Sequence, residues 1–389
     1  MKNEVKRLHQ IIKVIRSYHL LKDFSPENLR KAIEALGPTF IKIGQIASAR
    51  EDLFPEEYTK ELSKLRSQVK PMRFSIVKNL IESEYHQKWD SVFASIDKEP
   101  LGSASIAQVH KATLLSGETV AVKIQRENIE EAMCLDIKLL KKAISILNVQ
   151  KFLGDIIDLN DVLDEMYETA KKEMNFKIEA ENMIRFSQNQ KDILYIETPK
   201  VYEKLSTSRI LVMQYVTGLE IYRKQELIDL GYQLDEIALK LADNYLKQAL
   251  EDGFFHADPH ADNIKIDQGK IIYLDFGMMG ILSKNDREIL VDCMKSIISG
   301  DIEGVEHALL LLSVSSSSID YMRLRKDLQL ILERHQKKEI KDIDIKQFFY
   351  QLLSLLADNH IKLSRDITML IRGIIVLEGE SGCGKSTTL

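Results

Sequence analysis

The spacing of apolar residues changes twice along this chain, from helical to strand-like and back to helical. Residues 1 to about 85 repeat apolar positions with helical spacing. Between residues 92 and 124 the sequence turns to short β-rich runs, which end in ETVAVKIQ, a stretch suited to a buried strand. After Gly218 the pattern is again mostly helical. The chain is therefore predicted to be α+β and predominantly helical, with a β-rich lobe followed by a helical lobe.

Local signals place several elements within this outline. Helices are predicted near residues 129–147 and 159–188, a strand pair around TPKVYEKLSTSRILVMQYV, and two brief strands on either side of Gln268-Gly269. Ser25-Pro26-Glu27 has the residues of a helix start, because serine caps, proline tolerates the first position and an acid suits the first turn. Four prolines mark breaks between helices: Pro26, Pro38, Pro55 and Pro71.

The composition is that of a globular protein with little net charge. The 389 residues include 54 Lys and Arg against 59 Asp and Glu, a net charge of -5, and 44% are hydrophobic. A nucleic-acid-binding domain would be strongly basic, so nucleic acid is not an expected partner. Three separated cysteines, Cys134, Cys293 and Cys383, give neither a disulfide framework nor a zinc site, and they favour a reducing, cytoplasmic setting.

Two features of the sequence bear on membranes. No uncharged apolar stretch reaches the roughly 20 residues of a spanning helix, and the first residues lack the apolar core and cleavage site of a signal peptide. The first helix places Val5, Leu8, Ile12 and Ile15 on one face, with basic residues elsewhere. Such a face either packs on its own protein or rests on an anionic membrane surface, and both alternatives stay open.

Three stretches carry polar residues in an order that predicts chemistry. Lys123 ends the strand VAVK, so its ammonium should emerge at the lip of a cleft. Asp258 and Asn263 are five residues apart, as in the catalytic loop H-R-D-x-x-x-x-N. Asp275 opens D-F-G twelve residues after Asn263 and directly after the apolar strand KIIYL. Each motif alone is weak, but the ordered set predicts a kinase-like fold with two lobes.

This set supplies what phosphoryl transfer requires. Lys123 provides positive charge for the phosphates, Asp275 and Asn263 provide oxygen ligands for Mg2+, and Asp258 acts as general base or positions the attacking water. The alternative is that these residues are solvated loop carboxylates. Two histidines, His256 and His260, flank Asp258. Because Mg2+ prefers oxygen, a loop histidine here is expected to brace backbone carbonyls or the D-F-G turn rather than to bind metal.

The chain also resembles a known family. Ordinary protein kinases have a glycine-rich loop before the lysine, whereas the corresponding stretch here, PLGSASIAQVH, has one glycine. Together with FIKIGQ at residues 40–45 and HADPHADN at residues 256–263, it resembles the UbiB family of atypical kinase-like ATPases, from about residue 36 to residue 379.

The resemblance implies ATP and Mg2+ as cofactors and ATP hydrolysis that supports ubiquinone or isoprenoid lipid metabolism. The partners that it implies are the nucleotide, a lipid or quinone intermediate, and the inner face of a membrane. Phosphorylation of protein substrates is less expected. A scaffold that senses nucleotide or lipid without turnover is the alternative.

The resemblance also assigns roles to individual positions. In the family, the K-x-G-Q helix lies over the cleft where a protein kinase takes its peptide, so Lys42 and Gln45 should point inward. The helix partner of Lys123 corresponds to Glu179. The family's alanine-rich nucleotide loop corresponds to four consecutive residues: Gly102, Ser103, Ala104 and Ser105. Its metal and catalytic residues correspond to Asp258, Asn263 and Asp275.

Two positions depart from the family pattern. Where the family commonly has E-x-D before the helix glutamate, this chain has Glu173, Met174 and Asn175, so a salt link from the third position to Lys42 would weaken to a neutral hydrogen bond. The usual H-P-G-N ending of the catalytic loop is HADN here, which adds Asp262 beside a metal ligand. We expect the Asp262 side chain to point at solvent, because the family's glycine has no side chain there.

The last residues carry a second phosphate motif. GESGCGKSTTL fits G-x-x-x-x-G-K-[ST], but that loop requires a preceding strand and a full following helix, and only four residues follow Lys385. Because the stretch resembles the start of an ABC-transporter-type ATPase, we expect residues 380–389 to be foreign sequence. The predicted organisation is an N-terminal helical extension, a kinase-like N-lobe with inserted helices, a helical C-lobe and this tail: residues 1–90, 91–217, 218–378 and 379–389.

Overall fold

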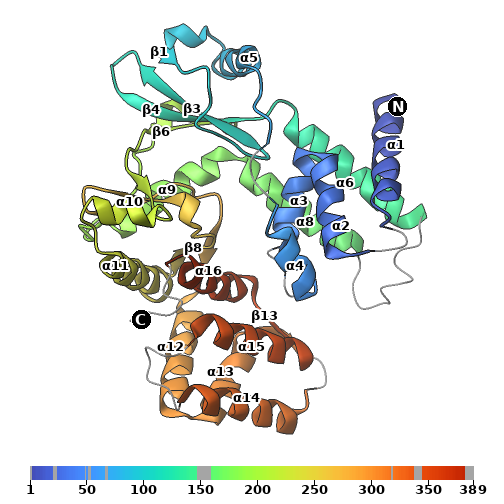
Figure 1. The fold of residues 1–389 in the computed structure, drawn as a ribbon, viewed down its shortest axis with the longest axis vertical. Coiled ribbons are helices and arrows are strands. Elements are labelled where there is room, and N and C mark those ends of the chain that lie inside the picture. Colours follow the sequence, from blue (N-terminus) through green and yellow to red (C-terminus); the bar gives the residue numbers. More distant parts are fainter. Residues whose placement is uncertain are drawn as a thin grey trace. The chain divides into compact units, whose positions relative to one another are not determined.

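A computed structural model describes residues 2–20, 24–48, 50, 54–65, 69–146, 159–316, 319–336 and 344–381. The chain divides into two compact units, each described by itself below (Figure 1). The first unit comprises Met1–Glu181 and Lys200–Val216, and the second comprises Asn182–Pro199 and Thr217–Leu389. The helical extension and the β-rich interval thus share one unit. The predicted division into four parts remains a prediction.

Helices at the start of the first unit begin where the sequence predicts. Pro26 and Pro38 are the first residues of their helices, where the missing N–H removes no hydrogen bond, and the Ser25 hydroxyl accepts a hydrogen bond from Asn28 N at 3.4 Å. The predicted helix start at Ser25-Pro26-Glu27 is therefore confirmed. The elements are α1 (Lys2–Ser17), α2 (Pro26–Leu36), α3 (Pro38–Ser48), α4 (Glu56–Leu62) and α5 (Phe74–Tyr85).

Helix α1 buries a different residue from those predicted to form its apolar face. Ile11 is only 1% exposed, whereas Val5 is 64% exposed. Arg7 forms an ion pair with Asp136 of α6 (Ile129–Ile146), with 2.6 Å between Nε and Oδ1. The helix contacts both α2 and α6. Part of its surface therefore packs on its own unit.

The β-rich interval forms a five-stranded antiparallel sheet (Figure 1). Its order is β1 (Phe93–Ile96), β3 (Ala107–Leu114), β4 (Thr119–Gln125) and β6 (Ile210–Gln214), and β2 (Gly102–Ser103) pairs with β3. The stretch ETVAVKIQ contains β4, whose Val120, Val122 and Ile124 are buried, so the predicted strand is confirmed. Val77 and Ile81 of α5 join these residues in one core cluster.

The predicted helix over residues 159–188 is interrupted once. It forms α8 (Leu159–Met174) and α9 (Phe176–Asn189), which begins in the first unit and ends in the second. Asn175 lies at the break, and its side-chain Oδ1 accepts a hydrogen bond from Lys177 N at 3.2 Å. An asparagine in this position caps a helix, which explains why α9 starts anew after it.

The second unit contains a four-stranded sheet and a two-stranded one. The larger sheet has the order β5 (Ile196–Glu197), β10 (Lys270–Tyr273), β9 (Ile264–Asp267) and β7 (Leu219–Glu220). Strand β8 (Phe254–His256) pairs with β11 (Met279–Ile281). The predicted hairpin is confirmed: β9 and β10 are joined by Gln268 and Gly269, with φ of 48° and 77°, as a tight hairpin turn requires. The strand pair predicted within residues 198–216 is wrong in part. One strand forms as β6, but the other is reduced to an isolated bridge from Val201 to Met213.

Helices make up most of the remaining second unit. Each helix from α12 to α16 contacts the next along the chain (Figure 1). Their buried side chains form one hydrophobic core, which includes Leu324, Leu328 and Ile367. The bounds are α10 (Lys224–Asp229), α11 (Leu234–Leu246), α12 (Lys284–Ser299), α13 (Ile302–Leu311), α14 (Tyr321–Gln336), α15 (Ile345–Asp358) and α16 (Arg365–Ser381), with β12 (Ser313–Ser316) paired to β13 (Ile361–Leu363). The chain is thus α+β and rich in helix.

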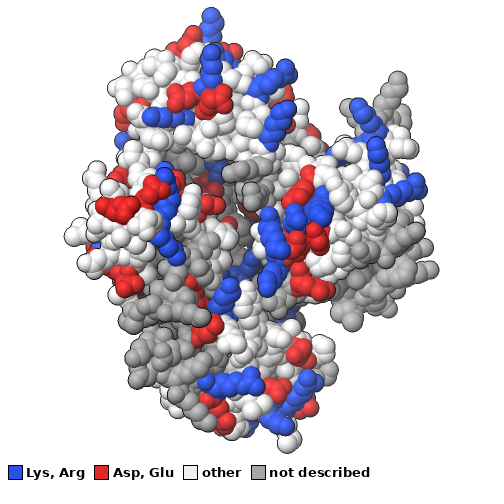
Figure 2. Space-filling view, viewed as in Figure 1, with Lys and Arg blue, Asp and Glu red and all other residues white. Residues whose placement is uncertain are grey.

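Three observations concern the surface, the membrane and the tail. Lys and Arg are interspersed with Asp and Glu on the face that Figure 2 shows. Within the described ranges, every helix is too short or too polar to span a bilayer. The first residues of the P-loop-like motif, 379–381, continue the backbone of α16 rather than follow a strand, and the rest of the motif, with Lys385, lies outside the described residues.

Candidate active site

The best-defined feature of the first unit is an ion pair between a strand and a helix. Lys123 lies on β4, and its Nζ donates to both carboxylate oxygens of Glu179 on α9, at 2.8 and 2.9 Å. The two side chains are 14% and 3% exposed. The ring of Phe176 lies 5.4 Å from Nζ. The structure therefore brings together the lysine and the glutamate that the family resemblance pairs, in a setting that water screens little.

Hydrogen bonds hold the predicted nucleotide loop, residues 102–105. Ala104 N donates to Ala107 O at 2.8 Å, which folds the loop back toward β3. The side chain of Arg126 holds it from the other side, with Nε donating to Ala104 O and Nη2 donating to Ser103 Oγ, both at 2.8 Å. Gly102 is exposed and Ser105 is buried. The contacts that hold the loop therefore include hydrogen bonds from Arg126 of its own unit.

The K-x-G-Q segment lies on α3, which contacts α2, α4, α6 and α8. Gln45 faces the nucleotide loop, because its Oε1 accepts from Ser105 Oγ at 3.4 Å while its Nε2 donates to Leu65 O at 3.4 Å. A Cβ placed on Gly44 would come within 2.4 Å of Leu65 Cδ1 and 3.2 Å of Ile33 Cδ1. A side chain at this position would therefore require Leu65 to shift.

Lys42 is paired from within the E-x-N stretch. Its Nζ forms an ion pair with a carboxylate oxygen of Glu173 on α8, and the two side chains are 13% and 9% exposed. Asn175, the position that departs from the family pattern, caps α9 through its Oδ1. The predicted weakening of a Lys42 link to residue 175 is therefore offset by a charged link to residue 173.

The second unit holds the other predicted site residues. Asn263 Nδ2 donates to Asp258 O at 3.4 Å, and Leu274 N donates to Asn263 O at 2.9 Å, which ties the catalytic loop to the end of β10. The Asp275 carboxylate accepts from Gly277 N at 2.9 Å. His260 Nε2 lies 3.1 Å from Asp258 Oδ1. Loop and D-F-G turn are thus joined by backbone contacts.

His256 links the loop to the D-F-G turn, as predicted. Asp258 N donates to His256 Nδ1 at 3.2 Å, so this nitrogen accepts, and His256 Nε2 donates to the carbonyl oxygen of Asp275. Burial lowers the pKa of His256, which is 1% exposed. Both effects favour the neutral ring, since a second proton on Nδ1 would face a backbone N–H.

Neighbours of the D-F-G turn were not anticipated from the sequence. Phe276 is fully buried, its ring packs edge-on against Phe186 at 5.0 Å, and its carbonyl accepts from Asn182 Nδ2 at 3.0 Å. Tyr245 Oη donates to His256 O at 3.1 Å. Asn182 lies three residues after Glu179 on α9, so helical spacing was the signal that could have found it. Nothing local marks Tyr245.

The predicted residues thus form two groups, one in each unit. Lys42, Gln45, the loop 102–105, Lys123 and Glu179 lie in the first unit. Asp258, Asn263 and Asp275 lie in the second, and the convergence of the two groups on one ligand stays a prediction. The Asp262 side chain is exposed, as expected.

The oxygen donors of the second unit fit a magnesium ion. An aspartate and an asparagine oxygen supplemented by phosphate oxygens suit Mg2+, which is rarely held by a complete protein cage. The described residues contain no cluster of three or more His, Cys, Asp or Glu side chains that could hold a metal by themselves. Because Nδ2 of Asn263 is directed to Asp258 O, its Oδ1 is the atom left to serve as a ligand.

A sheet-borne lysine paired with a helix glutamate, followed by a catalytic loop and a D-F-G turn in a helical unit, defines a kinase-like protein. Residues 64–309 match the ABC1 atypical kinase-like domain. The chain belongs to this family, which is related to UbiB, so the resemblance found in the sequence is confirmed.

Individual relatives agree with this assignment. The chain is 38% identical over 386 residues to an "Uncharacterized protein in hydrogenase 1 5'region" of Clostridium pasteurianum, covering 97% of this chain and 73% of that protein. It is 32% identical over 385 residues to Activity of BC1 complex kinase 8, chloroplastic, of Arabidopsis thaliana, covering 90% of this chain but 50% of that protein. The chain thus spans from half to about three quarters of these relatives' length.

A solved structure supports the fold. The Rv3197–erythromycin complex from Mycobacterium tuberculosis has a TM-score of 0.61 against this chain, with 22% identity, and covers 98% of this chain and 95% of that one. At this identity the likeness concerns the fold.

Proposed function

We propose that this chain binds Mg-ATP and hydrolyses it, in support of ubiquinone or isoprenoid lipid metabolism rather than of peptide phosphorylation. The observation that carries the proposal is the Lys123–Glu179 pair, with both N–O distances below 3 Å in a buried setting. In kinases this pair orients the lysine toward the phosphates. Membership of the ABC1 atypical kinase-like family supports the same activity.

Each residue then has a role that its contacts support. Lys123 neutralises phosphate charge, Glu179 holds Lys123 in place, and the loop 102–105 offers backbone groups to the nucleotide. Asp258 accepts the proton of the attacking water or positions it. When bound, Mg2+ would neutralise phosphate charge, and Asp275 and Asn263 would hold it through their side-chain oxygens.

The position of α3 argues against a peptide acceptor. Its Gln45 contacts Ser105 of the nucleotide loop, so this helix occupies space next to that loop within the first unit. Lys42 adds positive charge to the same helix. A helix fixed there leaves room for water or a small acceptor more readily than for a peptide. The lipid partner and a peripheral membrane location rest on the family resemblance and on the basic, partly exposed α1.

Phosphate release at saturating Mg-ATP tests the activity. Asp275→Asn should abolish turnover, and Lys123→Ala should weaken ATP binding. Asp262→Asn is the matched control, because it removes an exposed carboxylate from the same loop and should leave turnover unchanged. If nucleotide binding came from the P-loop-like tail instead, Lys385→Ala would remove it and Lys123→Ala would not.

A double-mutant cycle tests whether the two groups act on one triphosphate. If they do, the effects of Lys123→Ala and Asp275→Asn on ATP affinity are not additive, with a coupling of about 0.5–3 kcal/mol. Strict additivity would mean that the residues serve separate sites and would overturn the shared-site proposal.

A nucleotide-sensing scaffold without turnover is the second candidate. The observation in its favour is Asn175, which supplies a neutral amide where the family pattern has a carboxylate. ATP binding with no phosphate release above that of Asp275→Asn would support this candidate over the enzyme.

A further inference from the structure

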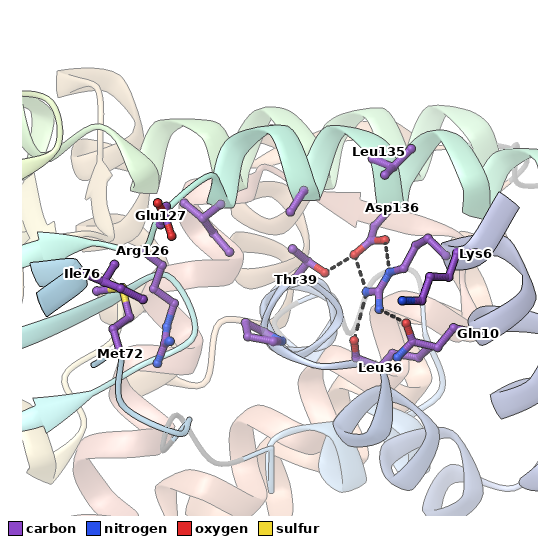
Figure 3. A pocket seen from close by; sticks show the side chains of 14 residues that line it. Lys6, Gln10, Leu36, Thr39, Met72, Ile76, Arg126, Glu127, Leu135 and Asp136 are labelled. Atoms are coloured by element: carbon purple, nitrogen blue, oxygen red, sulfur yellow. Dashed lines mark hydrogen bonds and ion pairs between the residues drawn. The ribbon is translucent and has the colours of Figure 1, made fainter. Parts of the chain in front are cut away.

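The first unit contains a pocket that the proposed chemistry does not use. It has a volume of 580 Å³ and is lined by residues of α1, α2, α3, α5 and α6, by Met72 just before α5, and by Arg126 and Glu127 between β4 and α6. Figure 3 shows Arg126 and Met72 at one end and Lys6 and Gln10 at the other, with Thr39 between them. Pockets that bind small molecules commonly have about 300–1,000 Å³. The size is therefore that of a ligand site.

Arg126 is the unusual residue of this pocket. It is 9% exposed, and among the described residues its guanidinium donates to neutral oxygens of Ala104, Lys70 and Ser103. Within the described part of the chain it forms no ion pair with a carboxylate. Buried cations are normally paired, because removal from water is otherwise uncompensated. In agreement, burial alone lowers the pKa of Arg126.

The hydrogen-bond count identifies which atoms remain available. A guanidinium has five N–H groups. Nε donates to Ala104 O, and Nη2 donates to Lys70 O and Ser103 Oγ, which accounts for three of them. The two hydrogens of Nη1 have no acceptor among the described residues. An oxyanion could accept both without breaking an existing contact.

The charges elsewhere in the pocket are already balanced or lie at its rim. Asp136 is neutralised by Arg7, whose Nε and Nη2 donate to its two oxygens at 2.6 and 2.7 Å, and Thr39 donates to it as well (Figure 3). Lys6 and Glu127 are exposed. The rest of the wall is largely apolar, with Leu36, Pro38, Met72, Ile76, Ile129 and Leu135.

We propose that this pocket binds a free, single-chain amphiphile, with its one anionic head on Nη1 of Arg126 and its hydrocarbon chain on the apolar wall. A carboxylate and a phosphate monoester share the required head chemistry. An amphiphile with a neutral head would leave Arg126 without a counter-charge, and a small inorganic anion would leave the apolar wall exposed to water. The charge of the head and the length of the chain are therefore both needed.

The same arginine connects this pocket to the proposed nucleotide loop. A head group on Nη1 leaves the bonds from Nε and Nη2 to Ala104 and Ser103 in place and fixes the guanidinium that makes them. Ligand in the pocket should therefore favour the ordered loop and tighten Mg-ATP binding by about fivefold or more. This coupling rests on the proposed function, whereas binding of the amphiphile does not.

Calorimetric titration of the full chain tests the proposal with four probes below their micelle-forming concentrations. Decanoate and decyl phosphate should bind, and decanol and decyltrimethylammonium should bind on the order of ten- to a hundredfold more weakly, the range for a hydrogen bond to a charged group. If only one of the two anions binds, the head chemistry is settled in favour of that one. Equal affinity for decanol and decanoate, or equally tight binding of inorganic phosphate, would overturn the proposal.

Variants with matched controls locate the site. Arg126→Gln should remove the preference for the anionic probes, whereas Arg209→Gln should not, because Arg209 also has a neutral partner, Gln125, but does not line the pocket. Ala132→Trp should block the pocket without touching Arg126. Ser145→Trp is its control, an exposed position on the same helix outside the pocket.

These outcomes separate this proposal from the proposed function. Circular dichroism checks that each variant is folded. If Arg126→Gln does not fold, Ala132→Trp still tests the pocket. Decanoate binding that Ala132→Trp leaves intact refutes the pocket even if Mg-ATP binds. Decanoate binding that Ala132→Trp removes supports the pocket even if Mg-ATP does not bind. In that last case the nucleotide proposal fails and the pocket stands.

Discussion

Replacing Gly373 by alanine sets helix propensity against packing in the second unit. Gly373 is a buried residue within α16, where alanine would ordinarily stabilise the helix by about 0.8–1 kcal/mol. A Cβ on this glycine, however, would lie 1.8 Å from Tyr245 Oη and 2.8 Å from Tyr245 Cζ. The tyrosine cannot move freely, since it is 2% exposed and its hydroxyl donates to His256 O at 3.1 Å.

The expected effect is a net destabilisation. Overpacking of a core costs about 1–3 kcal/mol, and loss of the hydrogen bond from Tyr245 to His256 adds about 1 kcal/mol. The gain in helix propensity offsets a similar amount, so the free energy of unfolding should fall by about 1–3 kcal/mol. For a unit of this size, a loss of about 2 kcal/mol lowers the midpoint of a thermal melt by roughly 4–8 °C. Far-ultraviolet circular dichroism follows this melt.

Tyr245→Phe provides the background that identifies the cause. Without the hydroxyl, the nearest atom to the new Cβ is about one ångström further away, so Gly373→Ala should cost much less there than in the parent chain. A Gly373→Ala chain as stable as the parent would refute the packing argument. An equal loss of stability in both backgrounds would show that the clash is not with the tyrosine hydroxyl.

Two further predictions concern the loop histidine and the K-x-G-Q glycine. Burial lowers the pKa of His256, so near pH 6.5 the unfolded chain takes up a proton that the folded chain does not. The free energy of unfolding should therefore fall as pH drops below about 6.5, by up to about 1.4 kcal/mol per pH unit. Urea unfolding between pH 5.5 and 7.5 should show this slope, and His256→Gln should reduce it. Gly44→Ala should destabilise the first unit by about 1 kcal/mol, because its Cβ would meet Leu65 Cδ1 at 2.4 Å. This loss of stability should be smaller in a Leu65→Ala background. An equal loss in that background would contradict the assignment of the clash to Leu65.

Local sequence signals predicted those parts of the fold that depend on neighbours in the chain. The strand β4, the cap at Ser25 and the hairpin turn at Gln268-Gly269 each follow from a few adjacent residues. The expectation that a loop histidine braces a backbone carbonyl or the D-F-G turn rather than a metal is also met, by the contact of His256 with the Asp275 carbonyl.

Local sequence signals did not predict contacts between residues far apart in the chain. Helix α1 has several apolar positions, and which of them is buried depends on α2 and α6, so the burial of Ile11 was missed, whereas Val5 of the predicted apolar face is 64% exposed. Likewise, Arg7 and its partner Asp136 are 129 residues apart. That Arg126 contacts neutral oxygens and no carboxylate among the described residues cannot be predicted from its sequence neighbours, because it depends on distant residues packed around the guanidinium.

An amide in place of a carboxylate at Asn175 removes a charge but keeps the helix cap that this residue forms. An aspartate and an asparagine both cap helices through a side-chain oxygen, and Asn175 does so by accepting from Lys177 N. The charge of Lys42 is balanced by Glu173, two residues earlier, in a pair that is largely shielded from water. The link to Lys42 that the family pattern assigns to residue 175 is thus made by a neighbour, and the amide of Asn175 itself caps α9. Asn175 alone is therefore a weak reason to regard the chain as a scaffold, and the choice between scaffold and enzyme depends on whether Asp275→Asn removes a measurable release of phosphate.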